Sequence, residues 1–271
     1  MPSISREFFT LSDGVRMAIY HRPGVGVPIF CIPGLTRNHR DFLPLLETFA
    51  ERPFYLCDLR GRGASDCDPN PENYRPETYA ADIAAWVHAH AKMPMDWVGT
   101  SLGGILTMAL AGQCSIRRAV INDIGPVIET SGLDAIRNRV GKAETFANWE
   151  DAQAAVIAGQ RPDHPRELDW AERTRALCVE RNGHIEFDYD PAIRQQAQGG
   201  DIPPFWPFYE QLHQIPTLVI RGESSDLLSE STYQQMLATH PNAQGVIVGQ
   251  TGHAPTLKEP EAQAALTAFL N

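Results

Sequence analysis

The sequence predicts an α/β fold with a mostly parallel central sheet of about eight strands, helices on both faces and an inserted helical segment. Three observations support this prediction. Short runs that are apolar throughout recur along the chain, helical patterns separate them, and the alternation stops between residues 127 and 212. Uninterrupted apolar runs are typical of strands that are covered on both faces, as in parallel sheets.

The N-terminal residues predict a β-hairpin. Residues 6–11 and 15–22 have β-like composition and flank Asp13-Gly14, a favoured turn dipeptide. We therefore expect the sheet to begin with two antiparallel strands.

The remaining strands are expected where apolar runs end in turn residues. They comprise residues 28–32, 54–58, 95–99, 117–123, 216–222 and 243–249.

Helices are expected between these strands. The pattern is clearest in residues 76–91, where Ala80, Ile83, Ala84 and Val87 are spaced to share one face. The other predicted helices comprise residues 41–49, 102–112, 230–237 and 259–270. A helix after each strand favours parallel pairing.

Residues 127–212 are rich in Ala, Arg, Glu and Gln and carry a helical rather than a strand-like pattern. A structureless loop of this length is improbable inside a compact domain. We therefore expect a helical cap at 127–212, inserted into a core domain formed by residues 1–126 and 213–271.

Composition argues against several classes of partner. The 271 residues carry 23 basic and 33 acidic side chains, a net charge of −10, without a basic cluster for nucleic acid. No apolar stretch is long enough to cross a membrane and no signal-peptide core is present, so a cytoplasmic protein is expected. The five cysteines form no CxxC pair, which argues against a disulfide framework or a zinc cluster. The expected partner is a small-molecule substrate, and oligomeric state is not indicated.

Ser101 is the candidate nucleophile. It stands in "GTSLGG", where an apolar run gives way to a helical pattern, and Gly99 and Gly103 complete the pattern G-x-S-x-G. A serine on such a tight bend has a strained backbone, and its neighbours two before and two after must lack a Cβ. The alternative is an ordinary turn, since Gly and Ser are common turn residues.

A serine needs a base and an orienting acid to act as a nucleophile at neutral pH. His253 follows the last predicted strand and is the candidate base. Asp226 is the favoured acid because it follows the strand at 216–222 and gives the chain order serine, acid, histidine. Asp123, at the end of the preceding strand, is the alternative acid, or else a carboxylate that caps the start of the insertion.

Two backbone N–H groups are candidate oxyanion donors. One belongs to Leu102, directly after the serine. The other belongs to Leu35, because Gly34 allows a sharp turn after the strand at 28–32. Without Ser101, Pro33-Gly34 would be an ordinary β-turn.

Five motifs together resemble the α/β-hydrolase fold family, specifically its serine hydrolases with a helical cap. They are "IPGL", "DLRGRGASD", "GTSLGG", "PTLVIRGESSDLL" and "TGHAP". The resemblance implies a triad of Ser101, Asp226 and His253, an oxyanion hole at Leu35 and Leu102, and a substrate pocket between core and cap. It implies no cofactor and no metal. Pro33 departs from the histidine that many relatives carry before the glycine.

The expected activity is cleavage of a small carboxylic ester through an acyl-enzyme. Relatives that use the same triad are enol-lactonases and C–C bond hydrolases, and these remain alternatives. Epoxide hydrolases and dehalogenases use an aspartate nucleophile, which Ser101 argues against. A ligand-binding protein or receptor without turnover is an alternative of another class.

Aromatic residues of the insertion are candidates for the substrate pocket. They are Trp149, Phe205, Trp206 and Tyr209. Their alternative role is a small core within the insertion. Arg60 and Arg62 suggest a carboxylate site, but arginines near a turn are more often intramolecular partners.

Overall fold

A computed structural model describes residues 4–141, 144–159, 169–198 and 202–271. Its centre is an eight-stranded sheet with the order β1-β2-β4-β3-β5-β6-β10-β11. The strands are β1 (Ser5–Thr10), β2 (Arg16–Arg22), β3 (Ile29–Ile32), β4 (Phe54–Cys57), β5 (Met95–Thr100), β6 (Ile116–Asn122), β10 (Thr217–Gly222) and β11 (Ala243–Val248).

The sheet is mostly parallel, as predicted. β2 pairs antiparallel with both β1 and β4, and the pairs from β4 through β3, β5, β6 and β10 to β11 are parallel. The expected N-terminal hairpin is present, with Ser5 opposite His21. The parallel strands bring their carboxyl ends to one edge, where ligands of open α/β sheets bind.

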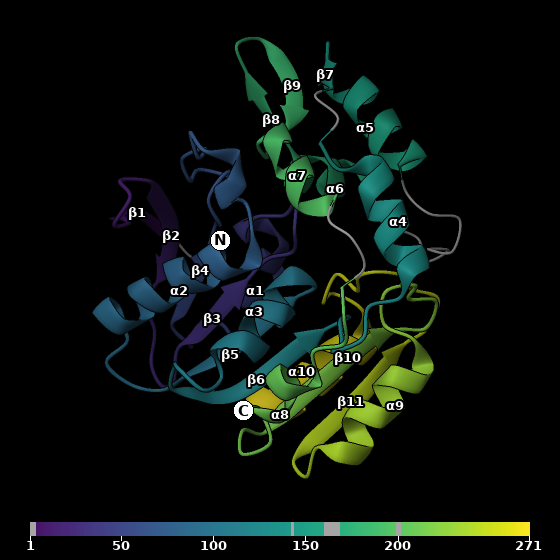
Figure 1. Ribbon diagram of the computed structural model, residues 1–271. Helices are drawn as coiled ribbons and strands as arrows, with labels where there is room; N and C mark the ends of the chain where they lie inside the picture. Colours follow the sequence, from purple (N-terminus) through teal and green to yellow (C-terminus); the bar gives the residue numbers. More distant parts are fainter. Residues whose placement is uncertain (1–3, 142–143, 160–168, 199–201) are drawn as a thin grey trace.

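Helices cover both faces of the sheet (Figure 1). Residues of α2 (Pro76–His90), α3 (Leu102–Leu110) and α9 (Glu230–Thr239) join one buried apolar cluster. Residues of α1 (Leu43–Thr48) and α10 (Pro260–Leu270) join another. Neighbours on β5 divide between the clusters, Trp97 in the first and Val98 in the second, because successive strand side chains point to opposite faces.

The predicted helix at 41–49 begins differently from the expectation. A 3₁₀-helix, η1 (His39–Phe42), precedes α1, and Asn38 caps it by accepting a hydrogen bond from the Arg40 N–H. Two other 3₁₀-helices are η2 (Pro71–Asn73) and η3 (Pro191–Ile193).

The chain between β6 and β10 is not purely helical, so the prediction of a helical insertion was incomplete. Its helices are α4 (Thr130–Arg139), α5 (Trp149–Ala158), α6 (Trp170–Leu177), α7 (Arg194–Ala197) and α8 (Trp206–Glu210). It also contains a sheet with the order β7-β9-β8, formed by Thr145–Phe146, His184–Phe187 and Cys178–Arg181. Asn182 and Gly183 join β8 to β9 with φ values of 52° and 78°, the positive values that a tight hairpin turn requires.

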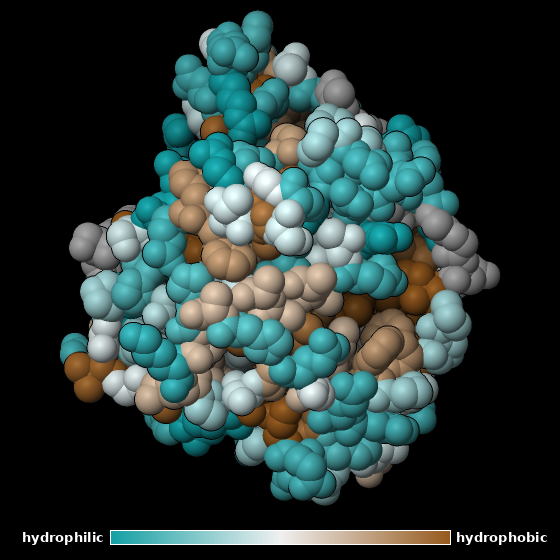
Figure 2. Space-filling view, turned by 60° about the vertical axis from the view of Figure 1, so that its left-hand side comes forward, coloured by the Kyte–Doolittle hydropathy of each residue, from teal (hydrophilic) through white to brown (hydrophobic). Residues whose placement is uncertain are grey.

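The surface is mixed in character. Figure 2 shows one face on which hydrophilic residues dominate and hydrophobic residues gather in a hollow across its middle. Within the described ranges, every helix falls short of the length and apolar character that a membrane span needs.

Candidate active site

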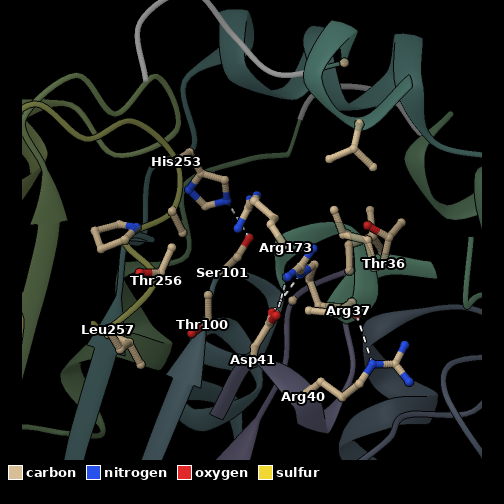
Figure 3. Close-up of a pocket in the computed structure, with 18 of the residues that line it drawn as sticks. Thr36, Arg37, Arg40, Asp41, Thr100, Ser101, Arg173, His253, Thr256 and Leu257 are labelled. Carbon is tan, nitrogen blue, oxygen red and sulfur yellow. Dashed lines mark hydrogen bonds and ion pairs between the residues drawn. The ribbon is translucent and has the colours of Figure 1, made fainter. Parts of the chain in front are cut away.

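Ser101 occupies a sharp bend between β5 and α3. Its φ of 54° and ψ of −117° are unusual for a residue with a side chain. Such a conformation persists only where the surroundings enforce it. The bend directs the Ser101 hydroxyl away from the sheet and toward His253 (Figure 3).

The glycines around Ser101 allow α3 to pack closely against the ends of β3 and β5. A Cβ on Gly99 would overlap the backbone of Gly103, and a Cβ on Gly103 would overlap the carbonyl of Ile32 at the end of β3. Helix α3 therefore packs directly against the strand ends. This is the steric requirement that the G-x-S-x-G pattern predicts.

His253 lies between a hydroxyl and a carboxylate. With the ring proton on Nδ1, the ring donates to Oδ2 of Asp123 over 2.8 Å, and Nε2 accepts the Ser101 hydroxyl over 2.9 Å. Asp123 is fully buried, and its Oδ1 accepts the backbone N–H of Gly222 over 2.8 Å. These bonds fix the carboxylate at the end of β6 and leave one imidazole nitrogen facing the serine.

The carboxylate that contacts His253 comes from Asp123, not from the favoured Asp226. Asp123 directly follows β6, which lies next to β5, the strand that leads into Ser101. Asp226 follows β10 on a loop whose backbone lies against α4, so closely that a Cβ on Gly132 would overlap the Asp226 carbonyl. The alternative that the sequence left open is therefore the one that the geometry brings to the histidine.

The loops at this edge of the sheet are cross-linked by the buried amide of Asn122. Its Nδ2 donates to Oγ1 of Thr100 over 3.1 Å and to the carbonyl of Pro255 over 3.0 Å. Thr100 precedes Ser101, and Pro255 lies on the His253 loop. One side chain of β6 thus joins the strand end of the serine to the loop of the histidine.

The candidate oxyanion donors lie beside Ser101. Leu102 is the first residue of α3, where N–H groups have no acceptor within the helix. Gly34 lies 3.6 Å from the Ser101 Cβ, measured from the position a Cβ on that glycine would take, and Leu35 follows it. The carbonyl of Leu35 accepts a hydrogen bond from Arg62 Nε over 2.8 Å, which holds the loop in place.

Ser101 and His253 line a cavity of about 490 Å³. Leu35 lines it from the core, and α4, α5 and α6 contribute Ile136, Val156 and Leu177. A volume of this size accommodates a small organic molecule.

The predicted aromatic pocket residues do not line this cavity. Tyr209 is fully buried, and its hydroxyl donates to the Met236 carbonyl over 3.0 Å. Trp206 and Phe205 pack against the apolar cluster that contains Tyr209 and residues of α2, α3 and α9. Trp149 packs in a small cluster within the insertion. The prediction was wrong because composition does not show which way each helix of the insertion faces.

Arg173 of α6 is a cavity residue that the sequence did not indicate. Figure 3 shows its side chain in the same space as Ser101 and His253, with Arg37 and Asp41 beside it. Burial, together with the charge of Arg37, lowers the pKa of Arg173 to about 10. No motif marks this residue, because an arginine in a polar helix is ordinarily a solvated side chain.

Comparisons with known proteins agree with this architecture. A family model described as the alpha/beta hydrolase family matches residues 29–266. A 3-hydroxybutyrate-oligomer hydrolase of Cupriavidus necator is 29% identical over 93% of this chain and 92% of its own length. A 2-(acetamidomethylene)succinate hydrolase of Mesorhizobium japonicum is 30% identical over 92% of this chain and 89% of its own.

A solved structure gives a close match in three dimensions. An alpha/beta hydrolase from Novosphingobium aromaticivorans superposes with a TM-score of 0.93 at 36% identity, covering 100% of this chain and 99% of that one. The fold, the family model and the hydrolase relatives lead to one conclusion: the chain belongs to the alpha/beta hydrolase family.

Proposed function

We propose that this protein is a serine hydrolase that cleaves small carboxylic esters through an acyl-enzyme. The observation that carries the proposal is the hydrogen-bonded series Asp123–His253–Ser101, with links of 2.8 and 2.9 Å. A nucleophile, a base and an orienting acid in hydrogen-bond contact are the groups that acyl transfer requires.

In the first half of the reaction, Ser101 Oγ attacks the ester carbonyl and His253 Nε2 takes its proton. Asp123 holds the imidazole in the required tautomer and stabilises its charged form. The tetrahedral oxyanion accepts hydrogen bonds from the N–H groups of Leu35 and Leu102. The protonated His253 then gives its proton to the departing alcohol oxygen, which leaves an ester on Ser101.

In the second half, water attacks the acyl-enzyme while His253 takes one of its protons. The same N–H groups stabilise the second oxyanion. When this second tetrahedral intermediate collapses, the bond between the acyl carbon and Ser101 Oγ breaks. Ser101 Oγ regains its proton from His253, and the carboxylic acid leaves. The groups thereby return to their starting protonation states.

Residues 127–212 would act as a cap over this site. Three of its helices supply walls of the cavity that contains Ser101. Removing water from around the reacting carbonyl strengthens the hydrogen bonds to the oxyanion. The core, residues 1–126 and 213–271, would supply the reacting groups.

The relatives support a hydrolase and point toward esters. Four of the similar proteins are named esterases, including a pimeloyl-[acyl-carrier protein] methyl ester esterase of Stenotrophomonas maltophilia that is 27% identical over 91% of this chain. A panel of aryl esters, enol-lactones and dienoic diketones would measure which bond this protein cleaves fastest.

Replacing Ser101 with Ala tests the nucleophile. We expect ester turnover to fall at least ~10³-fold, because the residual rate would come only from substrate binding and oxyanion stabilisation. A fluorophosphonate should label the wild-type protein stoichiometrically at Ser101 and leave the variant unlabelled. Near-normal turnover in the alanine variant would disprove the proposal, and labelling without turnover of any substrate in the panel would favour the ligand-binding alternative.

Replacing the two candidate acids separately tests the assignment of Asp123. Asp123→Asn should lower kcat by ~10³–10⁴-fold, because an amide cannot hold the imidazole in the reactive tautomer. The matched variant Asp226→Asn should stay within about three-fold of wild type, because Asp123 already holds the histidine. A larger loss in Asp226→Asn than in Asp123→Asn would reverse the assignment.

A further inference from the structure

We propose that Arg173 binds a free carboxylate of the substrate, so that the preferred ester carries a negative charge in addition to its scissile carbonyl. This inference rests on the proposed ester hydrolysis for the place of the reaction, and it adds the chemical class of the substrate. The observation behind it is a guanidinium inside the cavity of Ser101 that has no anionic partner among the described residues.

Arg173 lies where a bound substrate would meet it. It is on α6 of the insertion and lines the same cavity as Ser101 and His253. Its Nε is buried without a hydrogen-bond partner. Within the described ranges, no hydrogen bond or ion pair of its side chain is found, which leaves a fork of N–H donors directed into the cavity (Figure 3).

Other cations around the cavity already have partners. Arg37 pairs with Asp41 through Nε and Oδ2 over 2.7 Å, and Arg40 pairs with Asp188 over 2.7 Å. Lys258 pairs with Glu172 and is 42% exposed. Arg139 donates to backbone carbonyls of Ala135 and Gly159. Arg37 keeps a buried Nη1 without a hydrogen-bond partner, but its charge is paired with Asp41, so among these side chains Arg173 is the one whose charge has no anionic contact.

The nearby carboxylates do not pair with Arg173, although Oε2 of Glu259 is itself buried without a hydrogen-bond partner. Asp41 holds Arg37, and Oε1 of Glu259 accepts hydrogen bonds from the N–H and the hydroxyl of Thr256 over 2.8 and 2.9 Å. Both act on Arg173 only as more distant charges. None of the described residues therefore supplies an anionic contact to this guanidinium.

The electrostatics favour an anionic ligand. Burial is the largest cause that lowers the pKa of Arg173, and the charge of Arg37 lowers it further, to about 10. At neutral pH the side chain still carries its charge, and a desolvated charge without a partner is unfavourable. A carboxylate would relieve this penalty and would match the planar guanidinium with two parallel hydrogen bonds.

The test compares esters that differ in one charge. On the acyl side, 4-nitrophenyl monoesters of succinic, glutaric and adipic acid are paired with butanoate, pentanoate and hexanoate esters of similar length. On the alcohol side, 3-(butanoyloxy)propanoate is paired with propyl butanoate. We expect kcat/KM of the anionic member to exceed that of its neutral partner by ~10–10²-fold in at least one pair. The pair with the largest ratio gives the side and the spacing of the carboxylate.

Arg173→Met should abolish this preference while leaving kcat/KM for the neutral esters within about three-fold. Arg173→Lys keeps the charge and loses the planar pair of N–H donors, so its ratio of kcat/KM for anionic over neutral esters should lie between those of wild type and Arg173→Met. Lys258→Gln is the matched control, because it removes a paired, exposed cation from the same cavity, and it should leave the ratio within about two-fold of wild type. Equal loss on charged and neutral esters in Arg173→Met would overturn the proposal in favour of a structural role.

Binding to a Ser101→Ala background separates this proposal from ester hydrolysis itself. Calorimetry should show tighter binding of monomethyl glutarate than of methyl pentanoate, and adding Arg173→Met should remove the difference. That result would support the anion site even if the wild-type protein cleaved no ester. Cleavage of neutral esters without any preference for charge would overturn the anion site and leave the hydrolase proposal intact.

Discussion

A buried arginine, Arg60, and a half-buried arginine of the cavity, Arg173, have opposite arrangements of partners. Arg60, 1% exposed, lies among Asp13, Asp68 and Asp82, with contacts of 2.8 Å to Asp13 and 2.6 Å to Asp82. Burial alone lowers the pKa of Arg60, but its hydrogen bonds to these carboxylates outweigh burial and raise the pKa above its usual value. Arg173 has no such contact among the described residues, and its pKa is lowered.

The difference separates a structural charge from one that is available to a ligand. The Arg60 cluster fastens the loop after β4 to α2 and to the N-terminal hairpin, since Asp82 lies on α2 and Asp13 in the turn between β1 and β2. The sequence-based interpretation of Arg60 as an intramolecular partner is thereby confirmed. An arginine that stabilises the fold and one that remains unsatisfied should respond in opposite ways to the same substitution.

The largest expected effect is on the Arg60 cluster. Arg60→Met should lower the free energy of unfolding by ~3–5 kcal/mol, because it leaves buried carboxylates without their cation. Urea denaturation at pH 7 measures the change, and Arg16→Met, which removes an exposed ion pair with Asp66, is the control expected to shift the midpoint little. A loss for Arg60→Met no larger than that of the control would show that the cluster contributes little.

The second expectation concerns pH. Burial raises the pKa of Asp82 even beside Arg60, and removing Arg60 should raise it further. The folded variant then binds more protons than its unfolded chain, so its stability falls as pH rises. In wild type, burial raises the pKa of Asp13, but Arg60 and backbone N–H groups together outweigh burial and lower this pKa, so Asp13 contributes stability that increases as pH rises.

The stability difference between wild type and Arg60→Met should therefore widen as the pH rises from 4.5 to 7, by ~1–2 kcal/mol. Denaturation curves at several pH values measure it. A difference that stays constant over this range would contradict the assignment of the cluster as an ionic one.

The smallest expected effect is on Arg173. Arg173→Met should leave the free energy of unfolding unchanged or raise it by ~1 kcal/mol, because it removes a charge that has no anionic contact among the described residues. The same denaturation assay at pH 7 measures it. A loss above ~2 kcal/mol would show that Arg173 supports the fold, and the contrast with Arg60 would then disappear.

The sequence was sufficient for the elements of the sheet and for the expectation that Ser101 and His253 lie together, because both residues follow strands with apolar patterns. The choice of acid was harder. Asp123 and Asp226 both follow strands at the same edge, and the chain order favoured Asp226. The outcome depends on lateral strand order and on the path of the His253 loop, which are tertiary properties.

The insertion was predicted less well for a different reason. Its strands are two to four residues long, too short for a clear alternation of apolar and polar residues. Asn182-Gly183 did carry a hairpin signal, since this dipeptide adopts the required positive φ values readily. The aromatic residues at 205–209 had no comparable marker, because a packed core and a ligand pocket use the same side chains.

The amide of Asn122 has a consequence for how the site tolerates motion. Its two hydrogen bonds run to the segment before the serine and to the loop of the histidine, and its own strand leads directly into Asp123. We therefore expect bending of the sheet to move Ser101, Asp123 and His253 together rather than apart. The hydrogen bonds of Asn122 would then preserve the alignment of Ser101, His253 and Asp123 when other parts of the chain rearrange.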